Sequence, residues 1–273
     1  MPQGIAATLS GATRVVAIFG DPIAQVKSPA GVTRALNLAG RNCVVIPVHV
    51  GSADLDAFMR GVTVARNFDG LIATVPHKFA AYAHCASASQ RAHLLGAVNV
   101  MRRNPDLSWH GDMQDGCGFI DGIRGAGCQP QGARALLVGA GGAGSAIALA
   151  LLDAGVAQLA IHDDDARRRD ALRARLEARF PGRTCQGSRD PSGFDLVVNA
   201  TPSGMRAGDP LPVDAARLTP HMFVADVITA PAVTPLLVAA RQAGCHTATG
   251  GAMFDAVARL MVGFLLEAGA LAQ

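Results

Sequence analysis

The sequence predicts an α/β protein with two mostly parallel sheets, each in a domain of its own. A length of 273 residues exceeds what one core of ordinary size needs and favours two domains. Short apolar runs alternate with helical stretches from residue 14 to about residue 75, and the alternation starts again at Gly132. This rhythm is typical of parallel sheets with crossover helices. Half of the residues are hydrophobic and 16% are charged, which excludes a disordered chain.

The first third of the chain contains three predicted strands separated by two helices. Ser28 is expected to be the N-cap of the first helix, with Pro29 at the first helical position. Two further short strands flank Asn104 and Pro105 and are expected to form a hairpin on the same sheet. The predicted strands are 14–19, 43–48, 70–75, 98–102 and 107–110, and the predicted helices are 29–39 and 54–63.

The second half of the chain predicts a βαβαβ mononucleotide-binding unit with a continuation. A connecting helix and a glycine-rich linker are expected over 115–127. The elements that follow are a strand, a turn and a helix over 135–155, a strand over 158–163, a helix over 166–180, and strands over 195–201 and 222–227.

The C-terminal tail is expected to consist of two helices, with a break at 249–251. Apolar residues recur at helical spacing in the second helix, so we expect it to pack back against the first domain. This organisation predicts one domain over 1–115, a second over 116–235, and a return to the first over 236–273. The apolar residues are Met253, Val257, Leu260, Met261, Phe264 and Leu265.

Composition excludes several classes of function. The chain has 24 basic and 21 acidic residues spread along its length, so we expect no nucleic-acid or membrane partner and favour a small molecule. Six cysteines without a C-x-x-C pair predict no disulfide scaffold and no metal site. The uncharged stretch 135–152 reaches the lower limit for a membrane span, but four glycines break its first half. Without a recognisable leader, the protein is expected to be cytoplasmic.

A glycine motif predicts that the second domain binds a dinucleotide. Gly139, Gly141 and Gly144 form G-x-G-x-x-G between an apolar strand and a helix, with Gly142 inside the motif. The first glycine allows a tight turn, the second lets the backbone approach a pyrophosphate, and the third allows close packing of helix and strand. The helix N-terminus supplies N–H groups and partial positive charge. The alternative is a glycine turn that serves packing alone.

The end of the next strand favours NAD over NADP. Asp163 lies nineteen residues beyond Gly144, where an acidic side chain accepts hydrogen bonds from the ribose diol and repels a 2′-phosphate. Three arginines follow at 167–169. They either form a solvated helix face paired with aspartates, which we favour, or reach the 2′-phosphate of NADP.

Seven motifs, in order and across nearly the whole chain, resemble those of the shikimate dehydrogenase family. Such a resemblance implies an N-terminal substrate domain, a Rossmann-type cofactor domain and a C-terminal helix that returns to the first domain. The motifs are GDPIAQVKSP (20–29), TVPHK (74–78), GAVN (96–99), GDMQDGCGF (111–119), GAGGAG (139–144), NATPSGM (199–205) and DVITAPAVTPLL (226–237).

The resemblance assigns roles that spacing alone cannot. A lysine can move a proton to or from a reacting alcohol oxygen, and a nearby carboxylate can orient it, but nothing in the spacing pairs Lys78 with Asp115. By resemblance these two residues match the catalytic pair. Ser28, Thr74 and Asn99 match positions that contact substrate, and Thr201 belongs to a cofactor-domain motif.

The chain also departs from the family pattern where the family has polar side chains. Val26 and Ile72 stand at substrate-facing positions, which predicts a pocket less polar than one for shikimate. At the cofactor, the family's N-R-[TS] aligns with 162–164, so an acid occupies the position of the phosphate-binding arginine. The remaining departures are Met113, Gln114, Thr229 and Val257.

These observations predict an NAD-dependent oxidoreductase of shikimate or quinate dehydrogenase type. It is expected to interconvert a secondary ring alcohol and its ketone, on a cyclic hydroxy acid or polyol, as a monomer or homodimer. One alternative is an ordinary NADP-dependent shikimate dehydrogenase, an enzyme of aromatic amino acid biosynthesis. Another is a dinucleotide-sensing protein without turnover, which the retained Lys78 and Asp115 argue against.

Overall fold

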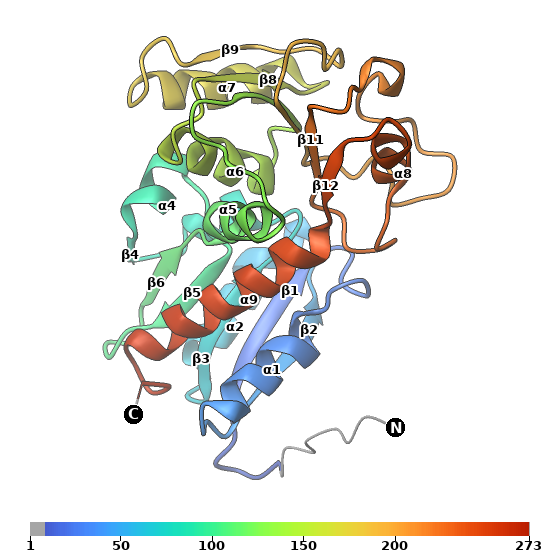
Figure 1. Ribbon diagram of the computed structural model, residues 1–273. Helices are drawn as coiled ribbons and strands as arrows, with labels where there is room; N and C mark the ends of the chain where they lie inside the picture. The colour runs from blue at the N-terminus through green and yellow to red at the C-terminus, as the bar shows by residue number, and fades with distance from the viewer. Residues whose placement is uncertain (1–8, 273) are drawn as a thin grey trace, which may run out of the picture. The chain divides into compact units, whose positions relative to one another are not determined.

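The computed structural model describes residues 9–272 and divides the chain into two compact units, each built on a six-stranded sheet (Figure 1). The first unit extends to Gln114 and resumes at Ala258, and the second is Asp115–Val257. Both are mixed α/β units, as the alternating pattern predicted. The chain passes from the first unit to the second between Gln114 and Asp115, and it returns to the first unit between Val257 and Ala258, within a helix.

The sheet of the first unit has the order β2-β1-β3-β5-β6-β4. Its three long strands are parallel, and the predicted hairpin is confirmed as an antiparallel pair on the same sheet. The strands are β1 (Arg14–Gly20), β2 (Cys43–His49), β3 (Phe68–Ala73), β4 (Ser87–Ala88), β5 (Val100–Arg103) and β6 (Trp109–Asp112).

Four helices and one 3-10 turn complete the N-terminal part of this unit. Ser28 is not the N-cap that the sequence predicted: α1 begins at Ser28 itself, Lys27 is the N-cap, and no side chain caps the helix. Pro29 in the first turn tolerates this start because it has no N–H to satisfy. The elements are α1 (Ser28–Leu38), η1 (Ser52–Asp54), α2 (Leu55–Val64), α3 (Lys78–Tyr82) and α4 (Gln90–Leu95).

The sheet of the second unit is entirely parallel, with the order β12-β11-β10-β7-β8-β9. This is the doubly wound order of the Rossmann fold, so the predicted class is confirmed. Two edge strands of three residues each, β9 and β12, were not predicted. The strands are β7 (Arg134–Val138), β8 (Gln158–His162), β9 (Thr184–Gln186), β10 (Leu196–Asn199), β11 (Phe223–Asp226) and β12 (His246–Ala248).

Helices connect these strands and carry the chain out of the second unit. The stretch 135–152 is divided between β7 and α6, and no helix in the described part of the chain is long and apolar enough to cross a membrane. The helices are α5 (Asp115–Gly125), α6 (Gly142–Asp153), α7 (Ala166–Glu177), η2 (Ala215–Arg217), α8 (Pro235–Gln242) and α9 (Gly250–Glu267).

The return to the first unit comes later than the sequence suggested. Residues from 236 were expected to return, but β12 pairs with β11 and keeps α8 and β12 in the second unit. Only the later part of α9 belongs to the first unit. There a Cβ on Gly70 would lie 2.5 Å from Leu265, and Arg102 donates to Glu267 at 2.5 Å. The C-terminal helix thus packs on the first sheet, as predicted.

Candidate active site

The glycine turn after β7 has the geometry that a dinucleotide-binding turn requires. Gly139 adopts a φ of 106°, and a Cβ there would lie 2.8 Å from the Ala200 carbonyl carbon. A Cβ on Gly144 would lie 2.0 Å from the Gly139 carbonyl oxygen, so only glycine allows this packing. Gly141 is the N-cap of α6, which starts at Gly142 with no side-chain cap, and a Cβ on Gly141 would meet nothing within 4 Å. The open helix start fits a pyrophosphate.

Asp163 follows β8 directly and lies beside this turn. Its Oδ2 accepts a hydrogen bond from the Ala140 N–H at 2.6 Å, and its Oδ1 accepts one from the Asp165 N–H at 2.8 Å. The side chain is 10% exposed. Because an ionised carboxylate has about four acceptor positions, it keeps acceptors for the ribose hydroxyls. The donor and acceptor set therefore fits the ribose diol of a dinucleotide.

Arginines around Asp163 are paired with carboxylates. The Arg168 guanidinium lies 3.9 Å from Asp163 and 3.5 Å from Asp165. Arg189 donates to both oxygens of Asp164, at 3.0 and 2.9 Å. Substantial parts of four of these side chains are exposed, namely Arg168, Asp165, Arg189 and Asp164. Arg168 therefore lies on a solvated helix face and is paired with aspartates, as the sequence favoured.

A buried polar network joins the carboxyl ends of β10 and β11. The Asp226 carboxylate accepts from Asn199 Nδ2 at 3.2 Å, from the Thr234 hydroxyl at 2.7 Å and from the Ile228 N–H at 3.0 Å. Burial raises the pKa of Asp226. Asn199 Oδ1 in turn accepts from the N–H and hydroxyl of Thr201, at 3.0 and 2.7 Å. The network fixes Thr201, a predicted cofactor residue, relative to the start of α8.

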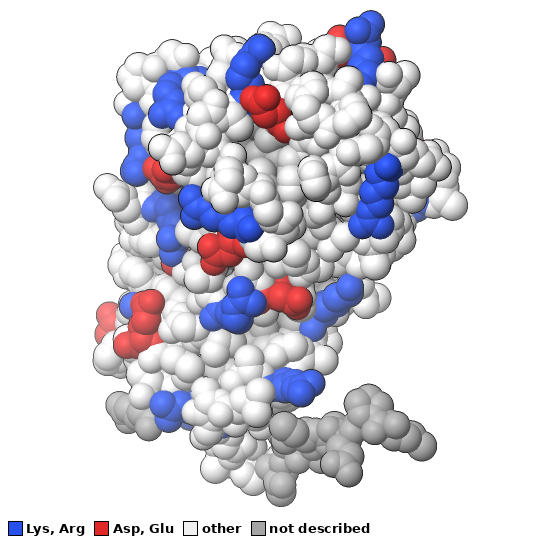
Figure 2. All heavy atoms as spheres, viewed as in Figure 1, with Lys and Arg blue, Asp and Glu red and all other residues white. Residues whose placement is uncertain are grey.

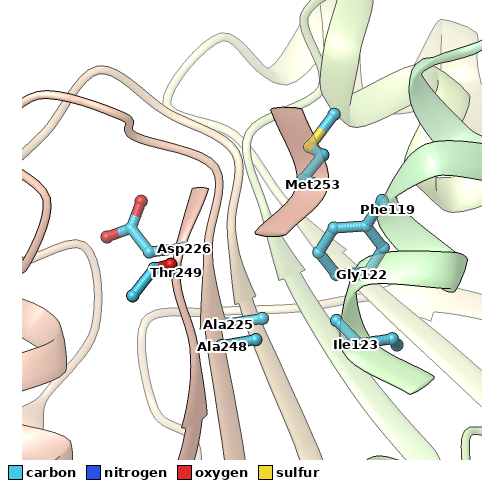
Figure 3. Close-up of a pocket in the computed structure, with 8 residues that line it drawn as sticks. All are labelled: Phe119, Gly122, Ile123, Ala225, Asp226, Ala248, Thr249 and Met253. Carbon is cyan, nitrogen blue, oxygen red and sulfur yellow. The ribbon is translucent and has the colours of Figure 1, made fainter. Parts of the chain in front are cut away.

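A small pocket of the second unit adjoins this network (Figure 3). Ala225 and Ala248 face α5 across it, whereas the Asp226 carboxylate points away from them. Its lining is mostly apolar, with no charged group aimed into the space. The lining residues are Phe119, Gly122, Ile123, Ala225, Asp226, Ala248, Thr249 and Met253.

In the first unit, Thr74 follows β3 and is held against the end of β1. Its N–H donates to the Phe19 carbonyl at 3.0 Å. A Cβ on Gly20 would lie 2.3 Å from the Thr74 methyl carbon, so the close approach requires glycine. Val26 and Ser28 lie on the segment between β1 and α1, where Val26 is half-buried and Ser28 is buried.

Lys78 is the first residue of α3 and its backbone is anchored on both sides. The preceding His77 is buried, with its Nε2 2.7 Å from the Val50 carbonyl oxygen and its ring stacked on Phe19 at 5.7 Å. The Lys78 carbonyl accepts from the Val98 N–H at 2.9 Å. His77 is therefore a buried anchor for the residue that follows.

Asn99 connects Lys78 with the segment before Asp115. Its N–H donates to the Asp112 carbonyl at 2.9 Å, and its Oδ1 accepts from the Gln114 N–H at 2.8 Å. Gln114 directly precedes Asp115, the first residue of α5 and of the second unit. The first unit therefore holds six predicted site residues, the apolar Val26 and Ile72 included, and the chain enters Asp115 directly after the bond from Gln114 to Asn99.

The apolar departures from the family pattern differ in their surroundings. Ile72 lies within β3 opposite Ile18 of β1 and Val100 of β5, and it is 2% exposed. Met113 is also buried. Val26 is the more accessible of the two residues predicted to face substrate.

The visible charges form no single-sign field. Figure 2 shows basic and acidic side chains interspersed on the face in view, with wide uncharged areas between them. Within the described residues, no group of three or more His, Cys, Asp or Glu is arranged to hold a metal ion.

Known proteins resemble this chain over nearly its whole length. A family model described as the shikimate dehydrogenase substrate binding domain matches residues 18–101. The shikimate dehydrogenase (NADP(+)) of Rubrobacter xylanophilus is 37% identical over 251 residues, covering 90% of this chain and 88% of that protein. The chain belongs to the shikimate dehydrogenase family. As a member, it is an NAD(P)-dependent oxidoreductase that acts on a CH–OH group.

Solved structures of the same type show how widely members of this fold differ in substrate. Quinate dehydrogenase from Corynebacterium glutamicum in complex with NAD has a TM-score of 0.81 and 29% identity, covering 93% of this chain and 98% of that one. The ligand-free 5-ketofructose reductase of Gluconobacter sp. has a TM-score of 0.82 and 29% identity, covering 95% of both chains. The family and the fold therefore leave the substrate open.

Two polar networks of the structure were missed by the sequence analysis. The Asn199–Asp226–Thr234 network joins the last residues of β10 and β11 with the N-cap of α8, and ligands bind at the carboxyl ends of parallel strands. That position was a usable signal for Asn199 and Asp226. The contacts of Asp112 with Arg91 join residues 21 apart and had no local signal.

Proposed function

We propose that this enzyme uses NAD to interconvert a secondary ring alcohol and its ketone on a cyclic hydroxy acid or polyol. The observation that carries the cofactor choice is Asp163, which follows β8 and whose carboxylate accepts from the Ala140 N–H of the glycine turn after β7. A carboxylate there accepts from the ribose diol and repels a 2′-phosphate. Gly139, Gly141, Gly142, Gly144 and Thr201 are proposed to hold the rest of the dinucleotide.

Lys78 is proposed to be the proton-transfer residue and Asp115 its partner. When bound, the nicotinamide supplies or accepts the hydride at the carbinol carbon. In the oxidation direction the neutral Lys78 amine takes the hydroxyl proton, and in reduction its ammonium returns a proton to the carbonyl oxygen. Asp115 is proposed to orient the lysine. The backbone bonds of Lys78 to Val98 and of His77 to Thr74 support a fixed starting point for this side chain.

The substrate side is proposed to involve Ser28, Thr74 and Asn99, with Val26 and Ile72 making the pocket less polar than that of a shikimate enzyme. Ser28, Thr74 and Asn99 supply hydroxyl and amide groups, the types that recognise ring hydroxyls. The two apolar residues offer no hydrogen bond.

An NADP-dependent shikimate dehydrogenase is the second candidate, because the curated relative described above carries that name. An assay at 340 nm with shikimate, quinate and other cyclic polyols, each with NAD and with NADP, separates the two. The proposal expects turnover with NAD and a substrate other than shikimate. Tenfold or greater preference for NADP together with efficient shikimate oxidation would establish the alternative. Dinucleotide binding without turnover on any substrate would support a sensor.

A further inference from the structure

Gln114 is a buried polar residue at a position where the family pattern has threonine. It lies between Asp112, the last residue of β6, and Asp115, the first residue of α5. Its side-chain Nε2 donates to Asp112 Oδ2 at 2.6 Å, and its backbone N–H donates to Asn99 Oδ1 at 2.8 Å. One residue therefore contacts both the strand end and a predicted substrate residue.

Asp112 is a rigid anchor for this contact. Its buried carboxylate accepts from Arg91 Nε at 2.7 Å, from the Met113 N–H at 2.7 Å and from the Ser89 hydroxyl, in addition to Gln114. The ion pair with Arg91 compensates its charge. A buried carboxylate surrounded by donors resists displacement, because losing any of them leaves a desolvated acceptor unmatched.

The bond from Gln114 also fixes the orientation of the Asn99 amide. Since Asn99 Oδ1 accepts from the Gln114 N–H, the amide cannot rotate by half a turn without placing an NH₂ group against that N–H. Nδ2 is then the group that Asn99 directs elsewhere, and it can only donate. Any group that contacts Nδ2, a substrate group included, must therefore be an acceptor, such as a hydroxyl, carbonyl or carboxylate oxygen.

We propose that Gln114 is a positioning residue that holds Asn99 in its donor orientation and fixes the backbone entering Asp115. This proposal rests on the proposed function in one respect, namely that Asn99 and Asp115 act on the substrate. The side-chain bond to Asp112 closes a short loop over residues 112–114, so the chain leaves β6 in one conformation. We call the bonds of Gln114 to Asp112 and Asn99 the Gln114 brace. Small displacements of reacting groups cost up to about 100-fold in rate, so loss of the brace has a measurable effect.

Two substitutions test the brace. Gln114→Met keeps the length of the side chain and removes the donor, and is expected to lower kcat/KM for the alcohol substrate by about 10- to 100-fold while the Kd for NAD changes less than twofold. Gln114→Glu places a second carboxylate beside Asp112, which raises the pKa of the new side chain. Its protonated form can again donate to Asp112. The kcat/KM of Gln114→Glu relative to wild type is therefore expected to increase at least fivefold as the pH is lowered from 9 to 6. The same ratio for Gln114→Met is expected not to depend on pH.

The titratable and charged groups around this position are Asp112 and His110 on β6, Arg91 on α4 and Asp115, the next residue, at the start of α5. They are common to the wild type and both variants, so the ratio isolates residue 114. Gln129, which is exposed in the second unit, provides the matched control: Gln129→Glu and Gln129→Met are expected to leave every ratio near one.

Hydrogen exchange gives a readout that does not depend on turnover. The peptide covering 110–119 is expected to exchange at least tenfold faster in Gln114→Met than in wild type. Unchanged exchange overturns the brace, whether or not a substrate has been found. Faster exchange with kcat/KM within twofold of wild type also overturns it, because Gln114 would then only stabilise the fold. If exchange accelerates but the wild type turns over no alcohol, the proposed function fails and the brace stands.

Discussion

The carboxylate of Asp163 accepts a hydrogen bond from the backbone N–H of Ala140 at 2.6 Å. This bond joins the end of β8 to the glycine turn after β7, the two places that contact the adenosine half of a dinucleotide in this fold. Asp163 therefore shapes the turn, in addition to its proposed role of presenting charge at the ribose. Changing it is expected to affect the cofactor preference through both roles.

Asp163→Ser is expected to weaken NAD binding and to relax or reverse the preference over NADP. Hydrogen bonds to charged groups contribute about 1.5 to 3 kcal/mol, so the Kd for NAD should rise roughly 10- to 150-fold. The Kd for NADP should fall, because the charge that repels its phosphate is gone and Arg168 lies nearby. Titrations of both dinucleotides measure the ratio. A wild type that prefers NADP tenfold or more contradicts this assignment at the outset.

Lys78→Met is expected to lower kcat by about 10² to 10⁴, the contribution typical of a general acid–base group. Dinucleotide affinity should not change, because the residues proposed to hold the dinucleotide do not include Lys78. Asp115→Asn should also reduce kcat. Steady-state rates at saturating cofactor, with dinucleotide titrations alongside, separate the two effects. A methionine variant that keeps most of its turnover would eliminate Lys78 as the proton-transfer residue.

Long periodic segments were predicted well, and short segments that depend on tertiary contacts were not. The strand β1 was predicted within one residue of its ends, and the stretch predicted as a strand, a turn and a helix over 135–155 corresponds to β7 and α6, which together span 134–153. The two-residue strand β4 and the three-residue strands β9 and β12 are too short to show a period, and they exist because a neighbouring strand pairs with them.

The same distinction applies to the candidate site. The glycine turn and Asp163 follow from local rules about strand ends and helix starts, and the structure gives them matching geometry. Ser28 was assigned as a cap from its neighbour Pro29, but the helix starts one residue earlier than that rule implies. The brace at Gln114 depends on Asp112 and Asn99 meeting across the sheet, which no local pattern shows.

Asp226→Asn is expected to change how stability depends on pH. Burial raises the pKa of Asp226 in the folded protein above its unfolded value of about 3.9. Between these two values the folded state binds more protons than the unfolded state, so the free energy of unfolding of the wild type falls as pH rises. It then levels off above the folded pKa. The asparagine variant lacks this contribution.

The measurement is the difference between the free energies of unfolding of wild type and Asp226→Asn, from denaturant titrations at several pH values. The free energy of unfolding of the wild type minus that of the variant should fall as pH rises from about 4 and then become constant. A difference that does not vary with pH, or that moves in favour of the wild type, contradicts the raised pKa. Asp190→Asn, at an exposed loop carboxyl whose pKa is lowered by its bonds to Ser192, should give the opposite sign.

Shikimate itself is expected to be a poor substrate, and Val26 is the position at which this can be changed. Val26 offers no hydrogen bond where the family pattern has serine, and it is half-buried on the segment before α1, so a serine there would not bury an unpartnered hydroxyl in the core. Ile72 is less suitable, because at 2% exposure within β3 an asparagine would carry the cost of a buried amide.

Val26→Ser is therefore expected to raise kcat/KM for shikimate. One restored hydrogen bond contributes about 0.5 to 3 kcal/mol depending on the charge of its partner, and we expect a gain of about tenfold, equivalent to about 1.4 kcal/mol. Val233→Ser, at an exposed valine of the second unit, controls for the change in side-chain type and should give no gain. Ordinary enzymes reach kcat/KM values of about 10⁴ to 10⁸ M⁻¹s⁻¹. A wild-type value for shikimate near 10⁵ M⁻¹s⁻¹ or above, with no gain in Val26→Ser, would show that Val26 only packs and that Ser28, Thr74 and Asn99 suffice to hold shikimate.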